Sequence, residues 1–163
     1  MDADTLLLHF AEDQAQADRL AQATGFAVAQ VVRHRFPDGE LKLRLPPQLP
    51  DRVVVLRSLD HPNEKLVELL LVASTARTLG ATHLTLVAPY LAYMRQDIAF
   101  EPGEVVSQRV VGRFLASLFD AIVTVDPHLH RVATLDEAVP VARAVVLSGA
   151  PLLADLIAQH HAK

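Results

Sequence analysis

The chain contains 163 residues, of which 51% are hydrophobic and 21% charged, and it carries a net charge of −4. This length is sufficient for one domain with a well-buried core. The slightly acidic balance gives no electrostatic reason to expect a nucleic-acid partner, because nucleic acids favour basic faces. The sequence has no cysteine, which excludes disulfides, thiolate metal sites and a cysteine nucleophile.

Nothing in the sequence predicts a membrane segment or a secretory signal. The apolar runs are far shorter than the ~20 residues that a membrane-spanning helix needs. The opening stretch, MDADTLLLHF, contains two acidic residues and no basic n-region, unlike a secretory signal. We therefore expect a cytoplasmic protein with no membrane partner.

In chain order, the first elements are a strand, a helix and two more strands. A short apolar strand at residues 6–10 precedes a helix at residues 12–24, which Gly25 ends. Strands are expected at residues 26–33 and 41–45. The second of these alternates Leu with Lys and Arg, as a half-exposed strand does.

The rest of the chain alternates strand and helix. Residues 53–56 form an unbroken apolar run, which is typical of a strand buried on both faces. A helix, a strand, a helix, a strand, an edge strand and a final helix then follow at residues 63–79, 84–88, 107–119, 122–125, 139–147 and 151–160. This alternation predicts the α/β class, with an open, mostly parallel sheet flanked by helices.

Three polar clusters stand where predicted strands end. FPDGE, residues 36–40, is on its own strong turn chemistry. PYLAYMRQD, residues 89–97, can be read as a solvated loop in which Arg95 and Asp97 pair at the surface for little gain. DPHLHR, residues 126–131, offers two imidazoles and a carboxylate for a divalent metal or phosphate, although such histidine pairs are also common in exposed loops.

The carboxyl ends of parallel strands meet at one edge of a sheet, where ligands bind in open α/β folds. We therefore expect Arg95 and His128 to converge on a single crevice, with Arg57 and Ser58 lining it as well. The sequence has no Walker loop, no G-x-G-x-x-G after a strand and no G-x-S-x-G elbow. Any nucleotide must therefore be held by side chains such as Arg95, Gln96 and Phe36.

Taken together, FPDGE, PYLAYMRQD and TVDPHLH resemble, in order and spacing, the motifs of ribose-phosphate pyrophosphokinases (phosphoribosyl pyrophosphate synthetases). NEKLVELL lies between them in the matching place, and the resemblance covers residues 33–153. It implies a phosphoribosyltransferase-like fold. It also implies transfer of the diphosphoryl group of ATP to ribose 5-phosphate, with Mg²⁺.

The resemblance also implies roles for individual residues. Arg95 and Gln96 would bind ATP, and His128 would be the catalytic residue at the metal and the polyphosphate. The cluster at residues 36–40 would reach the adenine and ribose of ATP in a neighbouring subunit through Phe36, Asp38 and Glu40. A complete site would then need a homo-oligomer.

Two departures from the family pattern stand out. Residues 98–104 contain no basic side chain, whereas many members are basic there. The acidic, glycine- and threonine-rich loop for ribose 5-phosphate and a mobile basic loop are missing, so residues 1–163 resemble a single N-terminal, ATP-side domain without the C-terminal domain.

Other functions stay open at this point. One is a non-catalytic regulatory protein associated with the synthetase, and another is a phosphoribosyltransferase of related fold. Retention of Arg95, Gln96 and His128 favours the enzyme lineage over the first. The missing ribose-phosphate loop argues against the second.

Overall fold

The computed structural model describes residues 4–161 and is built on a six-stranded parallel sheet. Its strand order is β2-β1-β5-β6-β7-β8, and each neighbouring pair runs in parallel. The strands are β1 (Thr5–His9), β2 (Ala27–Gln30), β5 (Arg52–Leu56), β6 (His83–Ala88), β7 (Ala121–Val125) and β8 (Arg143–Leu147). The predicted fold class is therefore confirmed.

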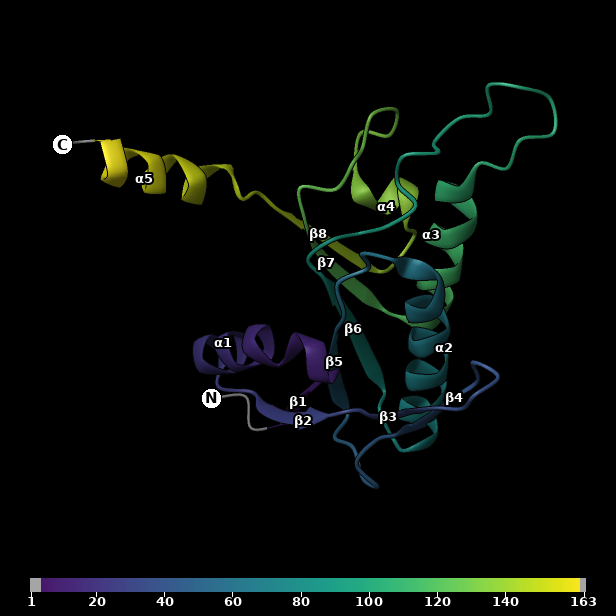
Figure 1. The fold of residues 1–163 in the computed structure, drawn as a ribbon, viewed down its shortest axis with the longest axis vertical. Coiled ribbons are helices and arrows are strands. Elements are labelled where there is room, and N and C mark those ends of the chain that lie inside the picture. Colours follow the sequence, from purple (N-terminus) through teal and green to yellow (C-terminus); the bar gives the residue numbers. More distant parts are fainter. Residues whose placement is uncertain (1–3, 162–163) are drawn as a thin grey trace.

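Helices follow most of the strands. They are the 3-10 helix η1 (Ala11–Asp13), α1 (Gln14–Thr24), α2 (Pro62–Thr78), α3 (Ser107–Leu118), α4 (Leu135–Ala138) and α5 (Ala150–His161). Helices α2 and α3 lie together on one side of the sheet, and α1 lies on the other side, beside β1 and β2 (Figure 1). No helix among the described residues has both the length and the apolarity that a membrane crossing needs.

The main core lies between the sheet and the helices α2 and α3. Alternate residues of β6, Leu84 and Leu86, are fully buried on this side, together with Leu69 of α2 and Leu115 of α3. The intervening residues of β6 are only half-buried, because the strand period of two turns them to the other face. That face is covered by α1 only at the β1 side of the sheet, while α5 projects away from β8 (Figure 1).

The predicted strand at residues 26–33 is wrong as a single element. It divides at Val31, which is buried and donates its N–H to the carbonyl of His9 at 2.8 Å. Strand β3 (Val32–Arg35) then leaves the sheet and pairs with β4 (Leu41–Arg44) in an antiparallel hairpin. Both halves have strand-forming residues, so composition alone gave no sign of the break.

The predicted edge strand at residues 139–147 begins too early. The short helix α4 was not expected, and Val139, which ends it, is fully buried. Strand β8 starts only at Arg143, after Pro140. Proline cannot donate a ladder hydrogen bond, which favours a start beyond it.

Candidate functional site

The adjacent strands β6 and β7 end at the same edge of the sheet, and each runs into a polar loop. We call these the β6–α3 loop (residues 89–106) and the β7–α4 loop (residues 126–134). A hollow of about 190 Å³ opens between them and is lined by Tyr90, Arg95, Asp126 and His128, among others. The structure thus brings Arg95 and His128 together, as the parallel topology predicts.

Both groups are available to a ligand. The Arg95 side chain is exposed and makes no ion pair with any other described residue, so its guanidinium donors remain free. His128 is also exposed, and its ring packs edge-on against His130 with 4.0 Å between ring centroids. An exposed guanidinium beside an imidazole is suited to binding an anion.

Gln96 does not line this hollow. Its side-chain amide donates to the carbonyl of Ile98 at 3.0 Å, so the group is engaged within its own loop. Gln96 is adjacent to Arg95 in the sequence, but it is not among the residues that line the hollow.

The backbone is unusual at this edge of the sheet. Among the described residues, the non-glycine positions with positive φ are His61 (49°), Tyr93 (63°) and Asp126 (41°), which follow β5, β6 and β7 respectively. Such conformations cost free energy and cluster at functional sites. The carboxylate of Asp126 accepts the N–H of Gly149 at 2.8 Å, which ties the end of β7 to the segment after β8.

Asp97 does not form the surface pair with Arg95 that the solvated-loop interpretation assumed. Its side chain is only 1% exposed, and its Oδ1 accepts a hydrogen bond from Nη1 of Arg131 at 2.7 Å. The pair joins the β6–α3 loop to the β7–α4 loop. The sequence carries no local signal of this contact, because the partners are 34 residues apart.

The residues Phe36, Asp38 and Glu40 lie at the tip of the β3–β4 hairpin and not at the hollow. The turn is closed by hydrogen bonds from the Phe36 N–H to the Glu40 carbonyl at 2.8 Å and from the Glu40 N–H to Asp38 Oδ1 at 3.1 Å. The hairpin projects beside α2 (Figure 1). Its turn chemistry is therefore confirmed, and within one chain the tip and the hollow are separate.

Arg57 was expected to line the crevice, and this prediction is wrong. Its side chain is 1% exposed and donates to Glu68 Oε2 at 2.8 Å, to Asp13 Oδ2 at 2.8 Å and to Glu12 Oε1 at 2.9 Å. Its guanidinium also lies 4.3 Å from the centre of the Phe10 ring. The sequence did contain a signal, since Glu68 shares a helix face with buried Val72, and a buried carboxylate needs a partner.

This buried ionic cluster, which also includes Arg33, alters the acidity of its members. Burial alone would raise the pKa of Glu12, but hydrogen bonds to the backbone and Arg57 and the charges of Arg57 and Arg33 outweigh it, so the pKa is lowered. Burial likewise would lower the pKa of Arg57, yet its carboxylate partners raise it. Both shifts favour the charged forms, the carboxylate of Glu12 and the guanidinium of Arg57.

A resident metal ion would find few ligands. Across residues 4–161 no group of three or more His, Asp or Glu side chains is arranged to hold a metal. Mg²⁺ prefers oxygen ligands and commonly binds through one or two carboxylates, waters and substrate phosphates. The donors at the hollow, Asp126 and His128, fit an ion that arrives with a polyphosphate better than one held by the protein alone.

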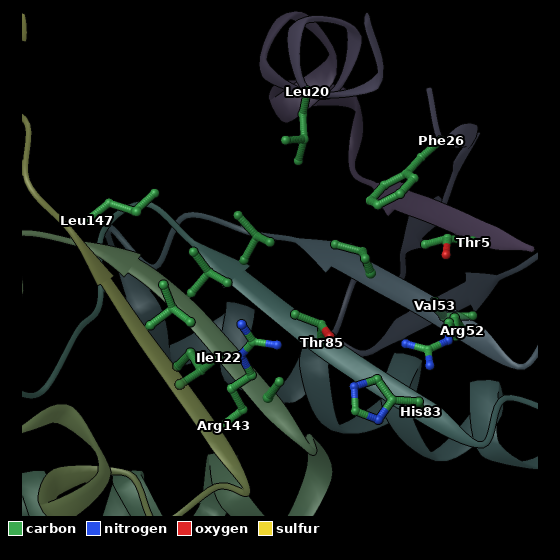
Figure 2. Close-up of a pocket in the computed structure, with 15 residues that line it drawn as sticks. Thr5, Leu20, Phe26, Arg52, Val53, His83, Thr85, Ile122, Arg143 and Leu147 are labelled. Carbon is green, nitrogen blue, oxygen red and sulfur yellow. The ribbon is translucent and has the colours of Figure 1, made fainter. Parts of the chain in front are cut away.

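A second hollow, of about 460 Å³, lies on the sheet face that α1 leaves uncovered. Figure 2 shows its floor of strand side chains, with Leu20 and Phe26 at one side and Arg143 and His83 near the amino ends of the strands. The floor is largely aliphatic, from Val54, Val87 and Val123 among others. Its charged and imidazole side chains, Arg52, His83 and Arg143, lie at the amino ends of the strands, whereas ligands bind at the carboxyl ends in open α/β sheets, so we place the candidate site at the carboxyl edge.

An open parallel sheet with polar loops meeting at its carboxyl edge defines a ligand-binding α/β domain. The family model for the N-terminal domain of ribose phosphate pyrophosphokinase matches residues 5–118. The chain therefore belongs to the ribose-phosphate pyrophosphokinase family.

Individual relatives agree with this assignment. The ribose-phosphate pyrophosphokinase of Methanopyrus kandleri is 45% identical over 118 residues, covering 72% of this chain and 40% of the relative. That of Halobacterium salinarum is 37% identical over 153 residues, covering 93% and 54%. The crystal structure of phosphoribosylpyrophosphate synthetase from Mycobacterium smegmatis superposes with a TM-score of 0.82 at 26% identity, covering 97% of this chain and 53% of that one. The chain thus spans about half the length of these relatives.

Proposed function

We propose that this chain is the ATP-binding domain of a ribose-phosphate diphosphokinase, which makes phosphoribosyl pyrophosphate for nucleotide biosynthesis. The observation that carries the proposal is the meeting of Arg95 and His128 on one hollow at the ends of β6 and β7. In the proposed reaction, the anomeric hydroxyl of ribose 5-phosphate attacks the β-phosphorus of ATP. AMP leaves, and the hydroxyl proton is released.

Catalysis of phosphoryl transfer consists mostly of positioning and charge stabilisation. Arg95 suits the polyphosphate because its guanidinium presents a fork of donors to anionic oxygens. His128 would hold the metal-bound phosphates in place, and Gln96 would contact the nucleotide once its bond to Ile98 is exchanged. Mg²⁺, when bound with ATP, supplies neutralisation of the charge that develops on the phosphate oxygens.

The β3–β4 hairpin supplies the rest of the ATP site to a neighbouring subunit, which makes the working protein a homo-oligomer. Support comes from the position of Phe36, Asp38 and Glu40, which are exposed at the hairpin tip. Arg35 fixes the hairpin to α2 through an ion pair with Glu64. A projecting hairpin that is anchored at its base is well placed to reach another copy.

We place this reaction in the cytoplasm, without nucleic-acid or membrane partners. A chain without cysteine suits a reducing compartment, and its net charge of −4 does not favour polyanionic surfaces.

A non-catalytic regulatory protein of the same fold is the alternative. It is favoured by the β6–α3 loop, which has Glu101 and Glu104 but no basic residue between positions 98 and 104. The two functions differ in a simple way, since the enzyme domain must bind ATP at the hollow and the regulatory protein need not.

Calorimetric titration of the chain with ATP, with and without Mg²⁺, tests the proposal. Arg95→Ala should weaken binding about 10-fold or more under both conditions, as expected for a lost charged hydrogen bond. His128→Ala should weaken it only when Mg²⁺ is present.

Arg19→Ala on α1 and His83→Ala at the start of β6 are matched controls, because they remove the same side chains away from the hollow. The proposal fails if the chain does not bind ATP, or if the controls weaken binding as much as the site variants do.

A further inference from the structure

The Asp97–Arg131 ion pair directly links the side chains of the two loops that carry Arg95 and His128. Arg131 Nη1 donates to Asp97 Oδ1 at 2.7 Å. The two ends differ in exposure: the Asp97 side chain is 1% exposed and that of Arg131 is 51% exposed. The carboxylate is therefore part of the protein interior, and the guanidinium reaches in to it from the neighbouring loop.

This pair differs from an ordinary surface salt bridge because its carboxylate is buried, which makes loss of the partner more unfavourable. Asp97 Oδ2 is buried and has no hydrogen-bond partner among the described residues. Burying a carboxylate is unfavourable unless it is paired, and here Arg131 is the ionic partner. Because the pair forms only when both loops adopt this arrangement, it favours one relative position of the loops over others.

A buried glutamine holds the other side of the same segment. Gln108, which is 1% exposed, donates its side-chain amide to the Met94 carbonyl at 3.1 Å and its backbone N–H to the Gln96 carbonyl at 3.2 Å. Residues 94, 96 and 97 are thus each fixed to the body of the protein or to the β7–α4 loop. Arg95 lies between these points, with an exposed side chain.

We infer that Asp97 and Arg131 are positioning residues that set the spacing of Arg95 and His128 for a nucleoside polyphosphate. This inference rests on the proposed function, and it names residues that act through the site and not on the substrate. Arg131 lies only three positions after His128. A loop movement that broke the pair would move both ends of the polyphosphate-binding surface relative to each other.

Nucleotide affinity tests the inference through a double-mutant cycle. Asp97→Asn and Arg131→Gln should each weaken binding of ATP with Mg²⁺ about tenfold, and the double variant should be no weaker than the weaker single variant. Arg131→Lys should recover part of the loss, because it keeps the charge. The control is Arg77→Gln, which removes an ion pair of the same 2.7 Å length with Asp120 at the opposite edge of the sheet. It should lower Tm and leave the ATP affinity unchanged.

Hydrogen exchange without nucleotide provides a readout that does not depend on the proposed function. Asp97→Asn and Arg131→Gln should each speed exchange in both loops, 89–106 and 126–134, whereas Arg77→Gln should not. If wild type fails to bind ATP, the proposed function is overturned and the exchange data alone decide whether the pair couples the loops. The inference is overturned if each variant affects only its own loop, if the affinity losses add, or if Tm falls with affinity unchanged.

Discussion

The buried ionic cluster around Arg57 allows a stability prediction that can be worked from the structure. The proposed change is Arg57→Met, which keeps an unbranched side chain of similar length and removes the charge. It leaves three carboxylates, of Glu12, Asp13 and Glu68, facing a single remaining guanidinium, that of Arg33. Glu68 is fully buried, so water cannot replace the lost partner.

Removing one partner of a buried ion pair costs about 3–5 kcal/mol, because a charge is left uncompensated. Since Arg33 still pairs with Glu12 and Glu68, we expect a loss of about 3 kcal/mol, at the lower end of that range. With a urea m-value of about 1–3 kcal/mol per molar, the unfolding midpoint should fall by about 1–3 M. The control is Arg35→Met, which removes the exposed pair with Glu64 and should cost less than about 1 kcal/mol.

The loss of stability caused by Arg57→Met should also depend on pH. The pKa of Glu12 is lowered in the folded protein, so its ionised form contributes stability above the unfolded pKa, and this contribution is lost as pH falls through the folded value. Arg57→Met removes part of that contribution, so wild type and variant should keep their difference in stability down to about pH 4.3, the ordinary pKa of glutamate, and should approach each other as the pH falls below it through the lower folded value. A variant as stable as Arg35→Met at pH 7, or a difference that grows in acid, would refute the reasoning.

Three further predictions concern packing, activity and assembly. Gly112→Ala should lower Tm by several degrees, because a Cβ there would lie 1.8 Å from the carbonyl oxygen of Ala138. The control is Gly103→Ala, whose Cβ would meet no atom within 4 Å, so that it should change Tm only through the positive φ at that position. The purified 163-residue chain should form no phosphoribosyl pyrophosphate from ATP, Mg²⁺ and ribose 5-phosphate, because its sequence lacks the ribose 5-phosphate loop; measurable product would contradict this. The chain should self-associate in sedimentation at tens of micromolar, and Phe36→Asp at the hairpin tip should weaken the association; a wild type that stays monomeric would contradict it.

The sequence correctly predicted those features of the site that depend only on where the strands end. The apolar runs at residues 53–56, 84–88 and 122–125 are each a parallel strand with one face in the core, and parallel strands end at a common edge. The convergence of Arg95 and His128 followed from this topology without knowledge of the loops. That β6 and β7 are neighbours in the sheet made the convergence close.

The contacts that hold the site could not be predicted, because they depend on loop conformation. Asp97 and Arg131 are separated by a helix and a strand, and nothing in their local sequence indicates that one is buried. For Arg57 the sequence indicated only that Glu68 lies on a buried helix face and needs a partner, and not which residue is that partner, because the contacts come from η1 and α2. Buried polar pairs are set by tertiary geometry, whereas strand and helix patterns are set locally.

The distribution of charge along the carboxyl edge gives an independent reason to place the anion site at β6 and β7. After β1 and β5, the positive charge of Arg57 is surrounded by carboxylates, and Lys65 pairs with Asp60 at 2.8 Å. After β6 and β7, the described residues include one carboxylate in an ion pair, that of Asp97. It is buried, and its partner is Arg131.

Arg95 and His128 have no carboxylate partner among the described residues. Both halves of the edge use similar side chains, but among the described residues only this half leaves a guanidinium, that of Arg95, free to meet a ligand. An anionic ligand gains little from charges that are already paired, so its binding is directed to the hollow between the β6–α3 and β7–α4 loops.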